Sequence, residues 1–192
     1  LHVANNGNLV GHPIHVVGHY SGPDNPNVVP NSSLTPDPFA NWVMPTFSGC
    51  TYTNFKATGN GPLVLSPGTY CGGISLSGTH TVHMKDGLYV LYGGGIKITG
   101  NSSPISGDNI TIYNSGNGGS YPYGDLGLSG GVVLDLSAPT TGAYAGMLFM
   151  QDKLNTQSAS IGGNAGSSLA GNFYFPKSNL NLSGTSGTTI PI

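Results

Sequence analysis

The chain has 192 residues but contains no arginine and no glutamate, and its charged side chains are five lysines and seven aspartates. Five lysines are too few to form a basic patch for the phosphate backbone of a nucleic acid. Nucleic acids are therefore not expected as partners. No apolar run approaches the ~20 residues that a transmembrane helix requires. Strong helix formers are scarce as well, since glycine alone occupies 32 positions. The sequence therefore predicts a protein built from strands and turns.

Apolar residues are nevertheless numerous, and their arrangement argues against disorder. They make up 37% of the chain and fall into short runs in which apolar and polar residues alternate. Such alternation is typical of strands with one buried face, and disordered segments lack it. We expect an all-β fold with many tight turns.

A repeat runs through the middle of the chain. Three similar segments, FKATG (55–59), ISLSG (74–78) and IKITG (96–100), follow one another at nearly regular intervals. Between them, PLVLSPGTY (62–70) aligns with TVHMKDGLY (81–89) at the same offset that separates FKATG from ISLSG. Short strands and glycine turns at a period of about 20 residues are typical of solenoids, in which each unit buries its apolar face against its neighbours.

Alternation within the repeat predicts which face of each strand is buried. Phe55, Ile74 and Ile96 occupy equivalent positions and are expected to form an interior ladder, with Lys56 and Lys97 on the outside. We predict a right-handed parallel β-helix, a solenoid of about eight layers. An antiparallel sandwich, whose strands recur every ~8–12 residues, explains the alternation but not the aligned offset.

The chain is expected to form a single domain over residues 1–192, with insertions at about 21–49 and 114–130 that interrupt the repeat. The first insertion is rich in proline and asparagine. Its Asp-Pro step at 37–38 combines an N-cap residue with a proline at the first helical position. A short helix is therefore predicted over residues 39–43.

The two cysteines, Cys50 and Cys71, are separated in the sequence by the length of one repeat. In stacked repeats they occupy adjacent layers, close enough to form a bond. We predict a disulfide between them, and two buried free thiols are the alternative. A disulfide implies an oxidising location, so an extracellular or cell-surface position is expected.

Four segments resemble a known family: DPFANWVMPTFSGCTYTNF, LSPGTYCGGISLSG, DGLYVLYGGGIKITG and NITIYN. They are similar to the glycine-rich extracellular region of TadG-like proteins, bacterial surface proteins associated with the assembly genes of Flp/Tad pili. The resemblance covers most of residues 35–115, and its most specific element is the pairing of GC-x-Y-T with PGTYCGG. It implies a structural part of the bacterial cell surface, with pilus or other surface components as partners, and carries over no catalytic residue. The family usually has an N-terminal membrane-anchoring segment, and because this sequence begins inside a β-like run, we expect it to be a piece of a longer protein.

Histidines are the first candidates for chemistry. On a helix, His12, His15 and His19 would share one face and bind zinc, but a proline, two glycines and two valines among them predict a strand. On a strand His12 faces away from the other two, so no metal site is predicted. His80 and His83 are interpreted as outer positions of the repeat, on opposite sides of their strand.

Catalysis is not expected, although many parallel β-helices cut acidic polysaccharides. Glycoside hydrolysis needs two carboxylates about 5–9.5 Å apart, and Asp135 is a strand carboxylate without an obvious partner. Asp86 is interpreted as a turn residue and Asp37 as a helix cap. Polysaccharide lyases of this fold typically rely on arginine, which the chain lacks. No cofactor is predicted.

We expect a non-catalytic structural or adhesive solenoid that associates end to end into filaments, because uncapped strand edges remain available for pairing. The alternative is a carbohydrate-binding or polysaccharide-degrading β-helix protein. An ice-binding face of Thr-x-Thr arrays is a weaker alternative, since only scattered cases occur. Trp42, Tyr121 and Tyr123 are candidate contacts to a partner or glycan, and packing of their loops onto the solenoid is their other possible role.

Overall fold

The computed structural model describes residues 13–100, 104–128 and 131–184, and in these ranges the chain forms strands, turns and loops without a helix. The predicted all-β class is confirmed. Contacts divide the chain into two compact units, one essentially within residues 1–45 and the other within 46–190, whereas the sequence predicts a single domain. The described ranges contain no helix with the length and apolar character that crossing a membrane requires.

The first unit contains a small parallel sheet. Its two strands are β1 (Ile14–Val16) and β2 (Val28–Pro30), and His15 lies opposite Val29. The strand predicted around the first histidines is therefore present, although it is short.

The helix predicted over residues 39–43 is wrong, because this segment forms a turn. The Asp37 carboxylate accepts a hydrogen bond from the backbone N–H of Phe39 at 2.8 Å, and the Asp37 carbonyl accepts one from Ala40 at 3.1 Å. Asp37 thus caps the segment as expected. However, Pro45 follows so closely that a helix cannot add the turns that repay its nucleation.

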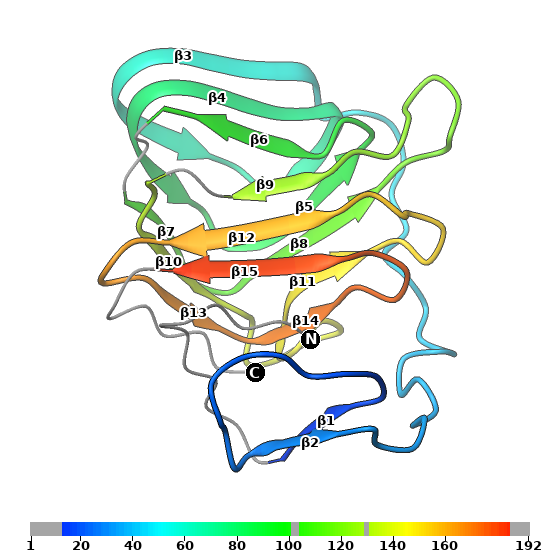
Figure 1. Ribbon diagram of the computed structural model, residues 1–192. Coiled ribbons are helices and arrows are strands. Elements are labelled where there is room, and N and C mark those ends of the chain that lie inside the picture. The colour runs from blue at the N-terminus through cyan, green and yellow to red at the C-terminus, as the bar shows by residue number, and fades with distance from the viewer. Residues whose placement is uncertain (1–12, 101–103, 129–130, 185–192) are drawn as a thin grey trace. The chain divides into compact units, whose positions relative to one another are not determined.

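The described residues of the second unit form a strongly curled sheet of 13 strands (Figure 1). It begins with two long strands, β3 (Tyr52–Leu65) and β4 (Gly68–Met84), which pair in parallel. β4 bends around the unit, so that its successive parts pair with β5, β6 and β7. The later strands are β5 (Gly87–Tyr92), β6 (Ile96–Thr99), β7 (Ile105–Gly107), β8 (Ile110–Ser115), β9 (Leu126–Leu128), β10 (Leu134–Ser137), β11 (Met147–Gln151), β12 (Ala159–Gly163), β13 (Ser168–Ala170), β14 (Asn172–Tyr174) and β15 (Leu180–Gly184).

Parallel pairing organises these strands into three ladders. From β5 on, each strand pairs with the third strand after it, which gives the series β5-β8-β11-β14, β6-β9-β12-β15 and β7-β10-β13. One strand from each series makes up a layer, and β3 and β4 each form a whole layer. The described residues therefore contain six layers in chain order: β3, β4, β5–β7, β8–β10, β11–β13 and β14–β15.

The middle ladder confirms the predicted register and facing. Its strands β3, β4, β6, β9, β12 and β15 follow one another down the front of the unit in Figure 1. Phe55 pairs with Ile74, and Ile74 pairs with Ile96. Both isoleucines are 3% exposed, while Lys56 and Lys97 are exposed on the other face.

The described layers number six rather than the eight expected, because the residues up to Pro45 form a separate unit and because later layers carry longer loops. Phe55 and its partner Ile74 are separated by one short repeat of the chain. The partners Ile96 and Leu126 are further apart in the sequence, and Ile112 and Phe149 are further apart still. The first of these extensions contains the loop 116–125 between β8 and β9, which lies within the insertion predicted at about 114–130, and the predicted range also includes the end of β8 and all of β9.

Stacked glycines at the corners explain why the sequence repeats itself. Gly59, Gly78 and Gly100 have φ angles of 106°, 102° and 109°, which residues with a side chain rarely adopt. A Cβ at Gly78 would collide with the Gly59 carbonyl, and one at Gly100 with the Gly78 carbonyl. At the next corner Gly73 approaches Gly95 in the same way. Backbone conformation and the neighbouring layer therefore both require glycine at these positions.

Two buried tyrosines account for the similarity of SPGTY and KDGLY. Tyr70 donates its hydroxyl to the Ser66 carbonyl at 2.6 Å, and Tyr89 donates its hydroxyl to the Lys85 carbonyl at 2.7 Å. Each phenol thus closes the turn that immediately precedes it. The two motifs are not directly opposite each other, because the ladder pairs Gly68 with Tyr89.

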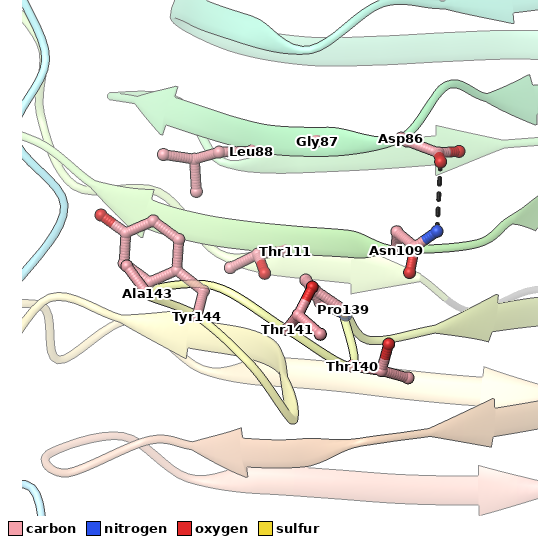
Figure 2. Close-up of a pocket in the computed structure, with 10 residues that line it drawn as sticks. All are labelled: Asp86, Gly87, Leu88, Asn109, Thr111, Pro139, Thr140, Thr141, Ala143 and Tyr144. Carbon is pink, nitrogen blue, oxygen red and sulfur yellow. Dashed lines mark hydrogen bonds between the residues drawn. The ribbon is translucent and has the colours of Figure 1, made fainter.

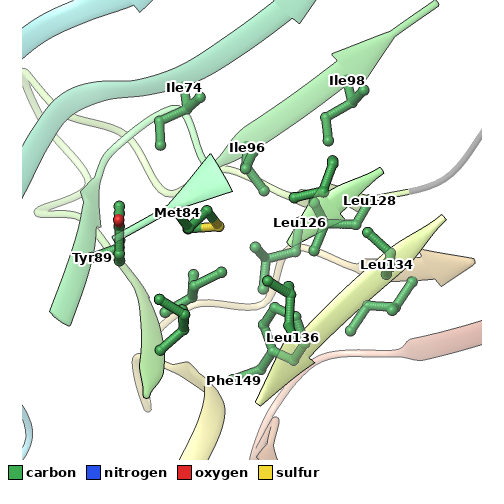
Figure 3. Close-up of a cluster of buried hydrophobic side chains, with 14 of the residues drawn as sticks. Ile74, Met84, Tyr89, Ile96, Ile98, Leu126, Leu128, Leu134, Leu136 and Phe149 are labelled. Carbon is green, nitrogen blue, oxygen red and sulfur yellow. The ribbon is translucent and has the colours of Figure 1, made fainter. Parts of the chain in front are cut away.

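Apolar side chains from all three ladders meet inside the second unit (Figure 3). This interior is the hydrophobic core, and burial of its side chains is the main term that holds the layers together. The labelled members of the cluster are Ile74, Met84, Tyr89, Ile96, Ile98, Leu126, Leu128, Leu134, Leu136 and Phe149.

Candidate functional site

β3 is an edge strand of the second unit. It pairs with β4, and the described residues place no strand on its other side. A free edge presents unpaired backbone N–H and C=O groups to which another strand can bind. The irregularity at Asn54 and the missing N–H of Pro62 interrupt this edge on either side of residues 55–59. They leave the stretch 55–59 as a regular edge.

Interior side chains of β3 are less buried than their partners in the next layer. Phe55 and Leu63 are half-buried, whereas the residues opposite them, Ile74 and Val82, are 3% and 0% exposed. The corner at Gly59 is also uncovered, since no atom lies within 4 Å of the place that a Cβ at Gly59 would occupy. The core is therefore open at β3, and one more layer would cover it.

The predicted disulfide is present at this open end. Cys50 and Cys71 are bonded, with their Cα atoms 5.6 Å apart. Cys71 lies in β4 and is 1% exposed, while Cys50 is exposed and precedes β3. The bond therefore ties the segment that leads into β3, the first layer, to β4, the second layer.

The aromatic residues predicted as contacts are divided between the two units. Trp42 belongs to the first unit, where its ring packs on Phe39 with a centroid distance of 4.9 Å. Tyr121 belongs to the second unit and packs on Tyr92 at 5.1 Å. Its hydroxyl lies 3.9 Å from the Cys50 Sγ. Tyr121 thus anchors its loop to the disulfide corner, and a contact to a partner remains a prediction for Trp42, Tyr121 and Tyr123.

A buried polar network lies where β8 and β11 end. Asn114 and Gln151 are opposite each other in the ladder, and both are 0% exposed. The Asn114 amide nitrogen donates to the Gly124 carbonyl at 2.8 Å and to the Gln151 amide oxygen at 3.2 Å. Asn155 donates to the same carbonyl at 3.2 Å. Sequence reasoning missed this network, whose one signal is that both strands end in polar residues, β8 in Asn114–Ser115 and β11 in Gln151.

Asp152 lies beside this network, and its carboxylate is occupied. Tyr113 and Ser115 donate their hydroxyls to one carboxylate oxygen at 2.8 and 2.9 Å, and the Leu154 N–H donates to the other at 2.9 Å. Burial raises the pKa of Tyr113 and of Tyr123, and the negative charge of Asp152 adds to both shifts. With three donors bound to its carboxylate, Asp152 has the environment of a structural hydrogen-bond acceptor.

Among the described residues, which include four of the six histidines, no group of three or more His, Cys, Asp or Glu side chains could hold a metal ion. His12 falls outside the described residues, and His15 lies 3.2 Å from the Ser32 hydroxyl. The prediction that His80 faces outward is wrong: it is 5% exposed, because it shares the alternation phase of the buried Val82. His83 is exposed, so the two do face opposite sides.

Comparison of the chain with family models, with curated proteins and with solved structures finds no significant match. The similarity to TadG-like proteins therefore stays a prediction from the quoted segments, and a functional proposal rests on the geometry described above.

Proposed function

We propose that the protein is a non-catalytic extracellular protein, structural or adhesive, whose second unit is a right-handed parallel β-helix that stacks end to end with further copies. The open first layer carries this proposal: β3 combines a regular free edge with core side chains that are only half covered. An added layer would pair with the free edge and cover the exposed parts of these core side chains.

The three ladders support the β-helix. Among the described residues, every strand pairing in the second unit is parallel, and layers follow one another in chain order. Parallel crossover connections are right-handed in about 98% of cases, which is the basis for the proposed hand.

Location and family are part of the same proposal. The Cys50–Cys71 bond fits an oxidising compartment, where disulfides persist. Together with the resemblance of residues 35–115, it supports a place at the bacterial cell surface as a TadG-like, pilus-associated subunit. Surface components of that system are the proposed partners.

End-to-end stacking brings β3 against the last layer of another copy. That layer consists of β14 and β15, which pair on one side only within the described residues. Phe55 and Leu63 at one end, and Phe173 and Leu182 at the other, are half-buried. Their burial, at about 25 cal/mol per Å² of apolar surface, favours association together with the new backbone hydrogen bonds.

An ice-binding function receives less support from the outer face of the middle ladder. Ordered water on such a face needs a regular array of threonines. The outward residues in register are instead Lys56, Ser75, Lys97, Gly127, Ser160 and Asn181.

Cleavage of polysaccharides is also less well supported. Asp135 is exposed on β10, but its neighbours in the ladder are Ser106 and Ser168 rather than a second carboxylate. Asp152 is held by three donors. Neither offers the pair of carboxyl groups that glycoside hydrolysis needs.

Sedimentation velocity over a range of protein concentrations tests the stacking. Wild-type protein is expected to form larger species as its concentration rises. Ala57→Lys directs a charge toward the open core and should keep the protein monomeric, because inward charges block strand addition. Thr58→Lys adds the same charge on the outward face of β3 and should still assemble. A wild-type monomer at every concentration, or equal loss of assembly in both variants, contradicts the proposal.

A further inference from the structure

An open recess of about 510 Å³ lies on the outer face of β5 and β8, beside the loop 138–146 that joins β10 to β11 (Figure 2). Its volume falls within the range of about 300–1,000 Å³ typical of small-molecule sites. The recess is distinct from the edge of β3, so stacking does not require it.

The recess has a polar end and an apolar end (Figure 2). At the polar end, the Asn109 amide donates to the Asp86 carboxylate at 3.1 Å, and both side chains are exposed. Leu88 and Tyr144 lie at the other end. The hydroxyl of Thr111, between the two ends, is already used, because it donates to the Met147 carbonyl at 2.8 Å.

The fold holds both ends in place without a ligand. Asp86 and Asn109 precede β5 and β8 at the same corner in consecutive layers. Asn109 has a φ angle of 54°, a left-handed conformation that is uncommon outside glycine. The loop is closed by a hydrogen bond from the Gly146 N–H to the Pro139 carbonyl at 2.7 Å.

The chemistry of these groups selects the ligand. A carboxylate beside an amide presents acceptors and a donor side by side, which suits neighbouring hydroxyl groups on one molecule. An aromatic ring and a leucine offer an apolar surface to the C–H face of a sugar ring. The lining contains one carboxylate and no lysine, so an anionic ligand would be repelled. Calcium is poorly served too, since it takes about 6–8 oxygen ligands and the side chains of Asp86 and Asn109 supply few.

We propose that this recess binds a neutral carbohydrate. Asp86 and Asn109 bind the hydroxyl groups, the ring of Tyr144 packs on the apolar face of the sugar, and the exposed Thr140 and Thr141 border it. The recess would give a surface protein a means of holding neutral glycans while its layers serve as scaffold.

Isothermal titration with a panel of trisaccharides tests the site. The neutral members are cellotriose, maltotriose, mannotriose and N-acetylchitotriose, and trigalacturonate is the acidic member. At least one neutral trisaccharide is expected to bind at millimolar concentration or below, and trigalacturonate is expected not to bind. Absence of binding by all four neutral sugars overturns the proposal.

Variants place the binding in the recess. Asp86→Asn is expected to weaken the affinity about tenfold or more, because a charged acceptor is lost, and Tyr144→Ala is expected to act in the same direction. Asp135→Asn removes an exposed carboxylate outside the recess and should leave the affinity unchanged. Equal effects of Asp86→Asn and Asp135→Asn overturn the proposal. Repeating the titration with Ala57→Lys separates sugar binding from assembly, since that variant is altered only at the open edge.

Discussion

Tyr70 and Tyr89 have exposed fractions of 1% and 0%, and this burial changes their acid–base chemistry. Burial, with a smaller contribution from Tyr52, raises the pKa of Tyr70 to about 12, and burial raises the pKa of Tyr89 as well. In the unfolded chain tyrosine has a pKa of about 10, so the unfolded chain loses these protons first. The stabilisation is therefore complete below pH of about 10 and is lost as the pH rises toward the folded pKa values.

Urea unfolding at a series of alkaline pH values measures this loss. Tyr70→Phe is expected to lower stability at neutral pH by about 1 kcal/mol, through the missing hydrogen bond to Ser66, but to flatten the alkaline decline. Tyr20→Phe, in the first unit, serves as the matched control. A decline of the same steepness in Tyr70→Phe and wild type would show that Tyr70 does not drive it.

The corner glycines allow the cost of backbone strain to be separated from the cost of a steric collision between layers. Gly59 and Gly78 have nearly equal φ angles, so alanine strains the backbone similarly at both. Only the Cβ of Gly78→Ala collides with a neighbouring layer. Gly78→Ala should therefore be less stable than Gly59→Ala by about 1–3 kcal/mol, the usual cost of overpacking. Equal free energies of unfolding in urea would mean that the layers are not in close contact at this corner.

Residue patterns predicted the strand register well where successive parallel strands repeat the same requirement. Glycine at a corner and isoleucine in the interior recur because neighbouring layers impose identical constraints. The network of Asn114 and Gln151 could not be predicted in this way, since these are different residue types, far apart in the sequence and brought together by a long loop.

The disulfide is the covalent connection between the first two layers. It closes a loop of 21 residues, for which the chain-entropy model gives about 3 kcal/mol of stabilisation. Replacing both Cys50 and Cys71 by serine should lower the free energy of unfolding by that amount in urea titrations. Wild-type protein with the bond reduced is the control and should lose a similar amount. No change in either case would contradict a bond that constrains the unfolded chain.

The polar network should hold the loop between β8 and β9. Gln151→Leu removes one of the two acceptors of the buried Asn114 amide and the donor to the Asn155 and Gln157 carbonyls, and should cost about 1–3 kcal/mol, the penalty for buried polar groups that lose a partner. Gln157→Leu changes an exposed glutamine nearby and should cost much less. Thermal unfolding of the two variants compares them directly. Equal stabilities would imply that Gln151 is not needed in the network.

At the scale of elements, strand register was predictable and element length was not. The register between β3 and β4 follows from the aligned motifs, because FKATG pairs with ISLSG as their alignment requires. The helix expected over residues 39–43 is absent, although its cap, Asp37, was predicted correctly. The segment is too short for helical hydrogen bonds to repay the cost of nucleation. The described residues contain fewer layers than expected, because the residues up to Pro45 form a separate unit and because loop length is not limited by the core.

The whole molecule brings together residues that no local pattern connects. The recess draws on three separate segments, around Asp86, Asn109 and Tyr144, from consecutive layers and one loop. Each segment is an ordinary turn in the sequence, so the combination becomes visible only when the layers are stacked. The open edge of β3 is likewise a property of the stack and of no single residue.

The stacking of layers itself is tested most directly by distances between spin labels on the outward positions of the middle ladder. Lys56 and Asn181 are separated by five consecutive pairings, and Ser75 and Asn181 by four. At ~4.8 Å per pairing, the backbone distances are about 24 and about 19 Å. The distances that double electron–electron resonance measures for the two pairs should therefore differ by one layer spacing. Lys56 and Ser75 nevertheless lie a whole repeat apart along the chain. Equal distances for the two pairs, or a difference several times one layer, would contradict the account.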